Sequence, residues 1–502
     1  MARDNSKILR NSIYVYGRLL FTMFLTLYTS RVVLEKLGVE DYGTYNIVAG
    51  ITVMFASIKS MFASAVQRFY NFEIGKGDNK DRINLVFNIG LKIHIYGALV
   101  LFCVLEMIGP WLISNQLDIP EHNLVAAHFI FQFTVVSTML TMASVPFDAM
   151  VIAREKIGFY AMISIIDAVL KLFIALFLPL INSDRLVYYG MLLLGVSIVN
   201  FVLLMVYSKR SFGDAIKIHK KKDAILLNEI MGFAGWNFFG NVSFSLTNEV
   251  SNLFLNLFGG VTANAARGIT YQVRGAVTSL LSNALVAVRP QATQEYAIGN
   301  ITSFFYIIYF ATKAVFFISL LVITPLFLFT DQILNLWLGQ VPDHCVDFTR
   351  IMLLQILIRS FHEPIDLIFK SAGHLRYYQL TSFLISIIGL PLIYILLMNG
   401  FSIQWVFIGM CIMEFVEFIC IAILATKEGL SIKSYITKSI IPIIMVTGLA
   451  AILSYVLYSY LHANIILCFI IIMFFLAAFV IFIGFNKKER AVLIGAVKKL
   501  KK

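Results

Sequence analysis

The sequence predicts an all-α integral membrane protein with about fourteen transmembrane helices, arranged as two parallel six-helix lobes plus two extra C-terminal helices. Three observations predict this fold class. Apolar residues make up 59% of the 502 residues, and the mean hydropathy is +0.84. Apolar stretches of about 20 residues, long enough to cross about 30 Å of hydrocarbon as helices, follow one another along the chain. Short motifs of the first half also recur, in the same order, in the second half.

The predicted helices are separated by short connections. They are expected at 13–34, 44–66, 85–108, 124–149, 159–181, 187–208, 230–257, 265–288, 304–330, 346–369, 378–398, 405–425, 439–461 and 465–484. The segment before the first helix is short and polar, and the first apolar stretch is a full span, so we expect no cleavable signal peptide. No polar stretch is long enough to form a separate water-exposed domain.

The distribution of lysine and arginine predicts the orientation in the membrane. The N-terminal segment, the even-numbered connections and the C-terminal tail together hold 28 of these residues, whereas the odd-numbered connections hold only Lys36 and Arg185. By the positive-inside rule, both termini are therefore cytoplasmic. The net charge of +12 follows this topology, so we expect no nucleic acid as a partner. The basic tail is expected either to lie on anionic lipid or to act only as a topology signal.

An internal repeat predicts the domain organisation. The motif Ile-Pro-Glu-His at 119–122 returns as Val-Pro-Asp-His at 341–344, an offset of 222 residues. Gly38 returns at the same offset as Gly260. This offset carries odd-numbered helices onto odd-numbered ones, so the two halves have the same orientation, as in transporters with parallel repeats. The predicted domains are a first lobe at 1–208, a basic cytoplasmic linker at 209–229, a second lobe at 230–425, two additional helices within 426–484 and a basic cytoplasmic tail at 485–502.

Neither the cysteines nor the histidines predict a metal site. The five cysteines lie mostly in apolar surroundings without a regular spacing, which is typical of small core residues. The duplicated loops place His122 next to Glu121 and His344 next to Asp343, a plausible ligand set for a metal. Duplication alone explains this recurrence, however, so we predict no metal, no cofactor and no catalytic residue.

Ten basic residues lie within the predicted spans or at their ends, where a central charge costs roughly 3 kcal/mol unless it has a partner or a wet cavity. They are Arg18, Arg31, Lys59, Lys92, Lys171, Arg267, Arg274, Lys313, Arg350 and Arg359. Those within about two turns of a span end could instead extend their side chains to the interface. Lys171 lies four residues after Asp167, and we expect those two to form an ion pair.

Arg274 is the deepest of these cations. It lies about nine residues into its predicted helix, roughly 14 Å from the helix start. Arg267 lies seven residues earlier and therefore on the same face. Arg359 is similarly deep, but Glu363 lies one turn further on, so an internal ion pair is an equally good interpretation.

The seventh predicted helix has a continuous polar face. Its members recur at intervals of three or four residues: Asn237, Asn241, Ser245, Asn248, Asn252 and Asn256. Asparagine amides both donate and accept hydrogen bonds, which suits sugar hydroxyls. The alternative is hydrogen bonding between helices, which is also common in lipid. Glu249 is the main acid of this region and has no evident partner in the sequence.

These residues together predict a cationic, amide-lined cavity for an anionic, polyhydroxylated cargo, since the forked guanidinium group suits phosphate. The candidate substrate-binding residues are Arg18, Arg31, Lys59, Asn241, Asn248, Asn252, Arg267, Arg274 and Arg359.

Several segments resemble the Wzx-type polysaccharide flippases (O-antigen flippases) of the MOP exporter superfamily. They are TSRVVLEKLGVEDYGTYNIVAG and RFYNFEIGKGD between Asn11 and Asp78, ASVPFDAMVIAREKIGFYAMISIIDAVLK from Ala143 to Lys171, NAARGITYQVRGAV and RPQATQEYA between Asn264 and Ala297, and LWLGQVPDHCVD from Leu336 to Asp347. The resemblance covers the first twelve helices and is weak over the last two.

The resemblance implies two lobes in a V shape around a hydrophilic cavity. It implies that the protein is not an enzyme but flips undecaprenyl-pyrophosphate-linked oligosaccharide across the bacterial inner membrane by alternating access, coupled to an ion or proton gradient. Polysaccharide assembly proteins are expected partners. The resemblance places Arg18, Arg31, Lys59, Arg267 and Arg274 around the pyrophosphate.

Three other functions remain open. A MATE-like drug antiporter has the same fold, but its usually cationic cargo calls for an acidic cavity. A lipid II flippase moves a cargo with the same pyrophosphate group. A membrane glycan polymerase or glycosyltransferase needs a large periplasmic loop or an acidic catalytic motif, whereas the longest outer connections, 109–123 and 331–345, have about fifteen residues.

Overall fold

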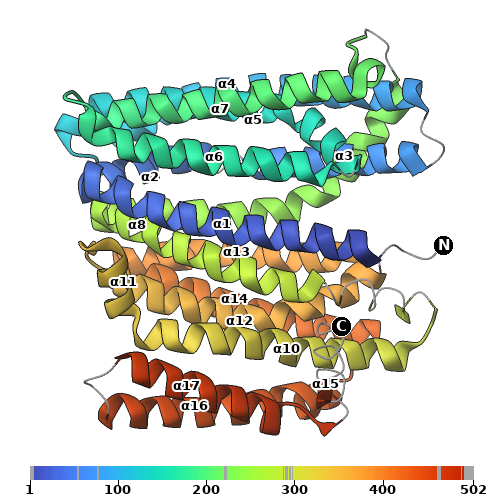
Figure 1. The fold of residues 1–502 in the computed structure, drawn as a ribbon, viewed down its shortest axis with the longest axis vertical. Coiled ribbons are helices and arrows are strands. Elements are labelled where there is room, and N and C mark those ends of the chain that lie inside the picture. Colours follow the sequence, from blue (N-terminus) through green and yellow to red (C-terminus); the bar gives the residue numbers. More distant parts are fainter. Residues whose placement is uncertain are drawn as a thin grey trace. The chain divides into compact units, whose positions relative to one another are not determined.

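A computed structural model shows the chain as a set of long helices (Figure 1). It describes residues 5–53, 56–75, 79–154, 156–219, 223–286, 288, 292, 295–296, 298–372, 374–460, 465–487 and 489–490. The described residues include no strand. Eight of the described helices are long and apolar enough to cross a membrane. The predicted all-α membrane fold is thereby confirmed.

The first half of the chain supplies the helices of the first six predicted spans. They are α1 (Asn5–Leu37), α2 (Val39–Val53), α3 (Ala56–Gly75), α4 (Lys80–Asn115), α5 (Leu124–Ala153), α6 (Ile157–Phe177) and α7 (Arg185–Phe212). The second predicted span is divided between α2 and α3. Several of these helices extend beyond the predicted spans, as expected where helices protrude from the hydrocarbon layer.

The second half begins with the longest helix and ends with the two additional spans. Its helices are α8 (Ala224–Val286), α10 (Ile301–Leu328), α11 (Thr330–Leu338), α12 (Cys345–Ala372), α13 (Leu375–Met398), α14 (Trp405–Ala425), α15 (Ile432–Tyr435), α16 (Ile441–Tyr460) and α17 (Ile465–Phe479). The element α8 contains both the seventh and the eighth predicted spans. Its backbone leaves the helical conformation and turns back at Gly260, where φ is +66°, so the two spans are the two legs of a hairpin. We call this element the α8 hairpin.

The internal repeat is visible in the backbone. Gly38 lies between α1 and α2 with φ of +88°, and Gly260 turns the α8 hairpin; both adopt the left-handed conformation that glycine adopts without strain. Asn79 caps α4 and Asn300 caps α10, and each side chain accepts backbone N–H groups of the first turn. The duplicated sequence therefore sets the same turns and helix starts in both halves.

The chain divides into two compact units, Met1–Gln272 and Val273–Lys502. In the first unit, α5 packs against both α4 and α7, and α1 packs against α6. In the second unit, α12 packs against α10 and α14, and α13 packs against α14. The first leg of the α8 hairpin and the start of the second belong to the first unit. The predicted lobe boundaries at 208 and 230 remain predictions.

The two additional spans pack within the second unit against α10. Phe317 and Leu320 of α10 share an apolar core with Val446 of α16 and Leu476 of α17. The segment after α17 adds a buried ion pair, in which Lys313 of α10 lies 2.5 Å from Glu489. The alternative that the Lys313 side chain extends to the membrane interface is therefore wrong, because Lys313 is 2% exposed and is held by a carboxylate.

Candidate functional site

The asparagine face of the α8 hairpin forms hydrogen bonds across the hairpin. Asn264 Nδ2 donates to Asn252 Oδ1 at 2.8 Å, and Asn256 Nδ2 donates to Asn264 Oδ1 at 2.9 Å. All three side chains are buried. Because a polar side chain in lipid needs a partner, these bonds fix the register of the two legs. In this conformation the Asn252 amide therefore holds the two legs of the hairpin together.

Arg267 is also enclosed by the hairpin. Its guanidinium group donates to the carbonyl oxygen of Asn248 at 2.9 Å, lies 3.6 Å from Glu249 Oε1, and stacks 4.0 Å from the centre of the Tyr271 ring. The Tyr271 hydroxyl donates to Asn248 Oδ1 at 2.8 Å. The expectation that Glu249 lacks a partner is therefore wrong, because the hairpin brings it beside Arg267. Arg267 Nε and Glu249 Oε2 are nevertheless buried without a hydrogen bond to any described residue.

The hairpin packs closely against α2. A Cβ atom on Gly43 would lie 1.9 Å from the carbonyl oxygen of Val261, and one on Gly50 would lie 2.4 Å from Asn252 Nδ2. Such short approaches are possible only with glycine, as in many helix contacts in membranes. We call the contact of Gly43 and Gly50 with the hairpin the glycine seam.

A polar cavity lies within the first unit between α1, α2, α5, α6 and α7. It consists of two adjoining chambers of about 510 Å³ and about 620 Å³, a size range typical of small-molecule sites. Hydroxyl groups dominate its lining: those of Thr22, Thr26, Thr29, Ser30, Thr134, Ser137, Thr138, Thr141, Ser144, Ser164 and Ser197 are among them. Most of these hydroxyls donate to a backbone carbonyl three or four residues earlier, for example Thr138 to Thr134 at 2.8 Å. Their oxygen lone pairs remain able to accept hydrogen bonds.

The charge in this cavity is largely balanced. Lys171 Nζ lies 2.8 Å from Asp167 Oδ2, which confirms the predicted ion pair on α6. Asn200 of α7 donates to the other carboxylate oxygen of Asp167 at 2.8 Å. A second acid, Asp148, accepts a hydrogen bond from Ser144 at 3.3 Å. The cavity therefore presents mainly neutral hydrogen-bonding groups.

In the second unit, Arg359 of α12 lies among carboxylates. It is 3.5 Å from Glu363, one turn further along α12, and 3.5 Å from Glu414 of α14. The pair with Glu363 confirms one of the two interpretations of the sequence. Arg274, in the second leg of the α8 hairpin, adds a favourable electrostatic interaction with the Glu414 carboxylate. Two of the predicted cargo-binding arginines thus share one acid.

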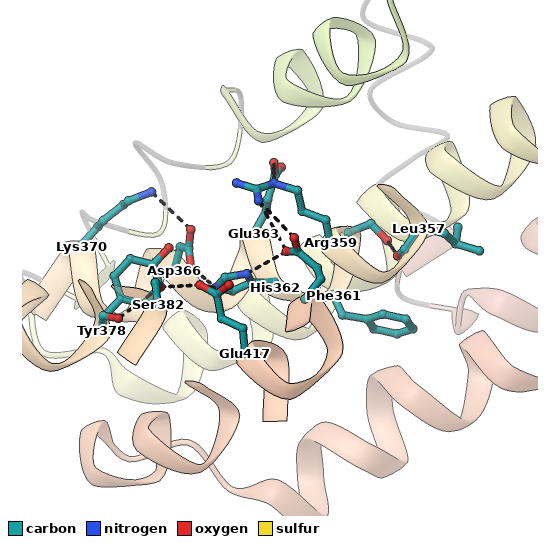
Figure 2. A network of polar contacts seen from close by, with 12 residues as sticks. Leu357, Arg359, Phe361, His362, Glu363, Asp366, Lys370, Tyr378, Ser382 and Glu417 are labelled. Atoms are coloured by element: carbon teal, nitrogen blue, oxygen red, sulfur yellow. Dashed lines mark hydrogen bonds and ion pairs between the residues drawn. The ribbon is translucent and has the colours of Figure 1, made fainter. Parts of the chain in front are cut away.

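Next to Arg359, a buried histidine joins three helices (Figure 2). His362 of α12 lies 3.4 Å from Glu414, 3.2 Å from Asp366 and 3.9 Å from Glu417. Ser382 of α13 donates a hydrogen bond to Glu417, and Lys370 lies 3.6 Å from Asp366. We call this group, together with Arg359 and Glu363, the α12–α14 cluster.

The sequence reasoning did not identify the α12–α14 cluster. A signal was present, because Glu414 and Glu417 are two acids one turn apart in an otherwise apolar span. Glu363 and Asp366 of the cluster also belong to a segment, Glu-Pro-Ile-Asp at 363–366, that repeats the pattern of Val-Pro-Phe-Asp at 145–148 in the first half. The histidines of the duplicated loops have partners of their own: His122 lies 3.3 Å from Glu40, and Gln404 contacts His344 at 3.4 Å.

The structure describes only some of the side chains of the predicted binding site. The side chains of Arg18, Lys59 and Asn241 lie outside the described residues. Arg31 is partly buried in α1. Arg18 precedes Thr22 by one helical turn, and Thr22 lines the cavity of the first unit. Binding of cargo by any of the nine predicted residues remains a prediction.

Comparison with known proteins places this arrangement in a known fold. Residues 238–395 match the MatE family model. The chain has no match among curated proteins.

Three solved structures illustrate the similarity. An inward-facing multidrug resistance MATE family transporter of the MOP superfamily matches with a TM-score of 0.67 at 15% identity, over 80% of this chain and 94% of that chain. A MOP superfamily transporter from Pyrococcus furiosus Vc1 gives 0.63 at 13% identity, over 85% and 96%. The lipid II flippase MurJ, in an inward closed conformation, gives 0.68 at 12% identity, over 94% and 98%. The chain therefore has the fold of the MOP-superfamily transporters and carries the MatE sequence pattern over residues 238–395.

Proposed function

We propose that the protein is a flippase for undecaprenyl-pyrophosphate-linked oligosaccharide. In this proposal it moves the lipid-linked glycan from the cytoplasmic to the periplasmic leaflet of the bacterial inner membrane by alternating access, as a step of surface polysaccharide synthesis. The hydroxyl-lined cavity of the first unit is the observation that carries the proposal. Sugar hydroxyls can donate to the oxygen lone pairs of its threonines and serines.

The pyrophosphate group is assigned to the membrane-embedded cations. Arg274 and Arg359 both interact with the carboxylate of Glu414, and an anionic cargo group can compete with that carboxylate for them. Arg18, Arg31 and Lys59 are proposed as further contacts because the resemblance to polysaccharide flippases places them there. Arg267 is the most restricted candidate, because Glu249 and Asn248 already occupy its guanidinium group.

The orientation and partners belong to the same proposal. Both termini are placed in the cytoplasm by the distribution of lysine and arginine. Other proteins of polysaccharide assembly are the expected partners, since they would supply the cargo and remove it.

A lipid II flippase is the second candidate, and one observation favours it. The MurJ match extends over 94% of this chain, whereas the MATE transporter leaves a fifth of it uncovered. A MATE-like drug antiporter is disfavoured, because Lys171 neutralises Asp167, one of the two acids of the cavity, and the cavity is therefore less acidic than a cationic drug favours.

Flipping in vesicles tests the proposal directly. The purified protein is reconstituted with undecaprenyl-pyrophosphate oligosaccharide or with lipid II, and a glycosidase added outside reports the glycans that reach the outer leaflet. We expect faster exposure of the oligosaccharide lipid than in protein-free vesicles. Faster exposure of lipid II alone would instead support the second candidate, and no acceleration of either cargo would overturn both.

Two sets of variants connect this activity to the residues. The double change Thr138→Val and Thr141→Val removes two hydroxyls at nearly constant volume; at about 0.5–1.5 kcal/mol each, flipping should fall roughly 5- to 150-fold. Thr437→Val, at an exposed position outside the cavity, is the matched control. Arg274→Ala should abolish export without lowering the protein level, whereas Arg210→Ala at the exposed end of α7 should not. Full export by Arg274→Ala would exclude the pyrophosphate role of that residue.

A further inference from the structure

One face of α5 is exposed along the first half of that helix. In this half, which the structure describes in full, the exposed residues are Val125, Phe129, Gln132 and Val136. We call these four residues the α5 stripe. At about 100° per residue, the stripe lies on the opposite side of α5 from Thr134, Thr138 and Thr141, which line the cavity of the first unit. The stripe is therefore separate from the proposed cargo site.

Gln132 is a polar residue within this otherwise apolar stripe. It lies eight residues after Leu124, where α5 begins, which corresponds to about 12 Å along the helix axis. A second measure of depth comes from Trp111 of α4, an exposed residue of the type that commonly lies at the membrane interface. Glu106, the partner of Gln132, lies five residues before Trp111, or about 7 Å deeper. Both measures place the Gln132 amide at the depth of the hydrocarbon.

The contacts of the described chain use only part of this amide. Gln132 Nε2 donates to Glu106 Oε2 at 3.0 Å, a bond that joins α5 to α4. No other hydrogen bond joins Gln132 to a described residue, so the second N–H and the carbonyl oxygen remain to be satisfied. The neighbouring polar bridge, from Ser114 Oγ to His128 Nε2 at 3.1 Å, lies nearer the helix ends, where water can solvate it. Gln132 lies too deep for water, and an exposed amide in hydrocarbon costs free energy unless another molecule supplies partners.

The spacing of the α5 stripe fits a second helix. Its members are separated by four, three and four residues, which is the spacing of the contact positions in two parallel helices that wind around each other. Helices in membranes commonly pack through such stripes, and glutamine is one of the residues that hydrogen-bond across their contacts. The missing partner of Gln132 is therefore best supplied by a transmembrane helix.

The amide itself indicates which helix this is. A carboxamide carries both a donor and an acceptor, so two of them form a reciprocal pair of hydrogen bonds. All copies of one membrane protein have the same orientation, and a two-fold axis along the membrane normal therefore sets α5 parallel to α5 of a second copy. In that arrangement each Gln132 meets its own equivalent. A single polar residue in the contact of a parallel coiled coil fixes register and helix number in the same way.

We propose that the α5 stripe is a dimerisation surface, through which two copies of this chain pack and hydrogen-bond by their Gln132 amides. Glu106 is a positioning residue, because its carboxylate holds one N–H of the amide and leaves the other for the second copy. The inference goes beyond the proposed function and does not depend on the cargo. In each copy the hydroxyl-lined cavity lies on the other side of α5.

Disulfide cross-linking in native membranes tests the contact. Phe129→Cys and Val136→Cys are introduced separately into the full chain, with the five native cysteines replaced by alanine. With copper phenanthroline as the oxidant, we expect a covalent dimer from each variant, because residues of the stripe face their own equivalents across the two-fold axis. The control is Ile388→Cys on α13, which is 59% exposed against 41% for Val136 and should stay monomeric.

Energy transfer in lipid vesicles measures the contribution of the amide. The full chain, labelled with donor or acceptor fluorophores, is diluted with lipid to give a dimerisation constant. Gln132→Leu removes two interhelical hydrogen bonds per dimer and should weaken dimerisation by about 5- to 100-fold. The matched control is the same change on α13, Gln379→Leu, which should leave the constant unchanged. Dimerisation of Gln132→Leu as strong as that of the wild type would refute the amide pair.

Two variants of Glu106 test its positioning role. Glu106→Leu removes the acceptor of the Gln132 N–H and should weaken dimerisation. Glu106→Gln keeps a carbonyl oxygen that can accept the same N–H, and should restore most of the wild-type dimerisation constant. If both variants weaken dimerisation equally, Glu106 does not act by holding the amide.

The cross-linked products also distinguish the possible occupants of the stripe. Cross-linking of Ile388→Cys as fast as that of the two stripe variants would show random collision and overturn the proposal. A product whose mass is not twice that of the chain would show that another membrane protein occupies the stripe, and would overturn the assignment to a second copy. Absence of any product from both stripe variants would show that the stripe faces lipid only.

Discussion

The buried ion pair between Lys313 and Glu489 attaches the C-terminal segment to the second unit. Both side chains are 3% exposed, and the Nζ–Oε2 distance is 2.5 Å. Glu489 Oε2 also accepts the backbone N–H of Asn486 at 2.8 Å, whereas among the described residues the further contact of Lys313 is with the Phe485 ring, 5.6 Å away. The change Glu489→Leu therefore leaves a buried ammonium group with almost no compensation.

The cost of that change can be stated in advance. Removing one partner of a buried ion pair costs about 3–5 kcal/mol, because the remaining charge stays desolvated. At about 2–4 °C per kcal/mol for a unit of this size, the melting temperature should fall by roughly 6–20 °C. Lys313→Met should cost less than Glu489→Leu, because the carboxylate keeps the Asn486 hydrogen bond.

Thermal unfolding of the detergent-purified protein, followed with a thiol-reactive dye, measures this effect. The dye would report the exposure of the thiols of Cys345 and Cys468, which are buried and form no disulfide with a described residue. The double change Lys313→Met and Glu489→Leu is the decisive control: it removes both charges, so the free energy of unfolding should return to within about 1 kcal/mol of the wild type. If Glu489→Leu alone melts like the wild type, the pair does not hold the C-terminal segment.

Two further predictions concern the first unit. Gly43→Ala should destabilise the first unit by about 1–3 kcal/mol, because the new methyl group overlaps the Val261 carbonyl. The control is Gly232→Ala, where no described atom lies within 4 Å of the new Cβ. In the same melting assay this change should be neutral or stabilising. Burial raises the pKa of Asp41, despite the opposing hydrogen bond from Asn123, so its folded form binds a proton more tightly than the unfolded chain. Its contribution to stability is therefore present at low pH and lost as the pH rises through the folded pKa: acidification from neutral pH to about pH 4, the ordinary pKa of an aspartate, should stabilise the wild type more than Asp41→Asn.

The features set by local sequence could be predicted. Gly38 and Gly260 mark equivalent turns because each position needs a left-handed backbone, and the repeat in sequence identified both. The pair of Asp167 and Lys171 was predictable for the same reason, since residues four apart on one helix face each other whatever the surrounding packing.

Partners on different helices could not be predicted in the same way. Arg267 meets Glu249 only because the α8 hairpin folds back at Gly260, and Arg359 meets Glu414 only because α12 packs against α14. Spacing along one helix gives the face on which a charge lies, but not the rotation and height of the neighbouring helix. The cavity of the first unit was missed for this reason: its threonines and serines come from separate helices.

These pairings change how an anionic cargo can be recognised. The sequence suggested a cavity with excess cations, but Arg267, Arg359, Lys313 and Lys171 each lie within 3.6 Å of a carboxylate. A cargo phosphate must therefore exchange with an internal carboxylate. Exchange is easiest where the cation is accessible and its carboxylate has another way to be neutralised. Arg359, 33% exposed and with a histidine behind its carboxylate partner, meets both conditions, whereas Arg267, 8% exposed and held by Glu249, the Asn248 carbonyl and the Tyr271 ring, does not meet the first.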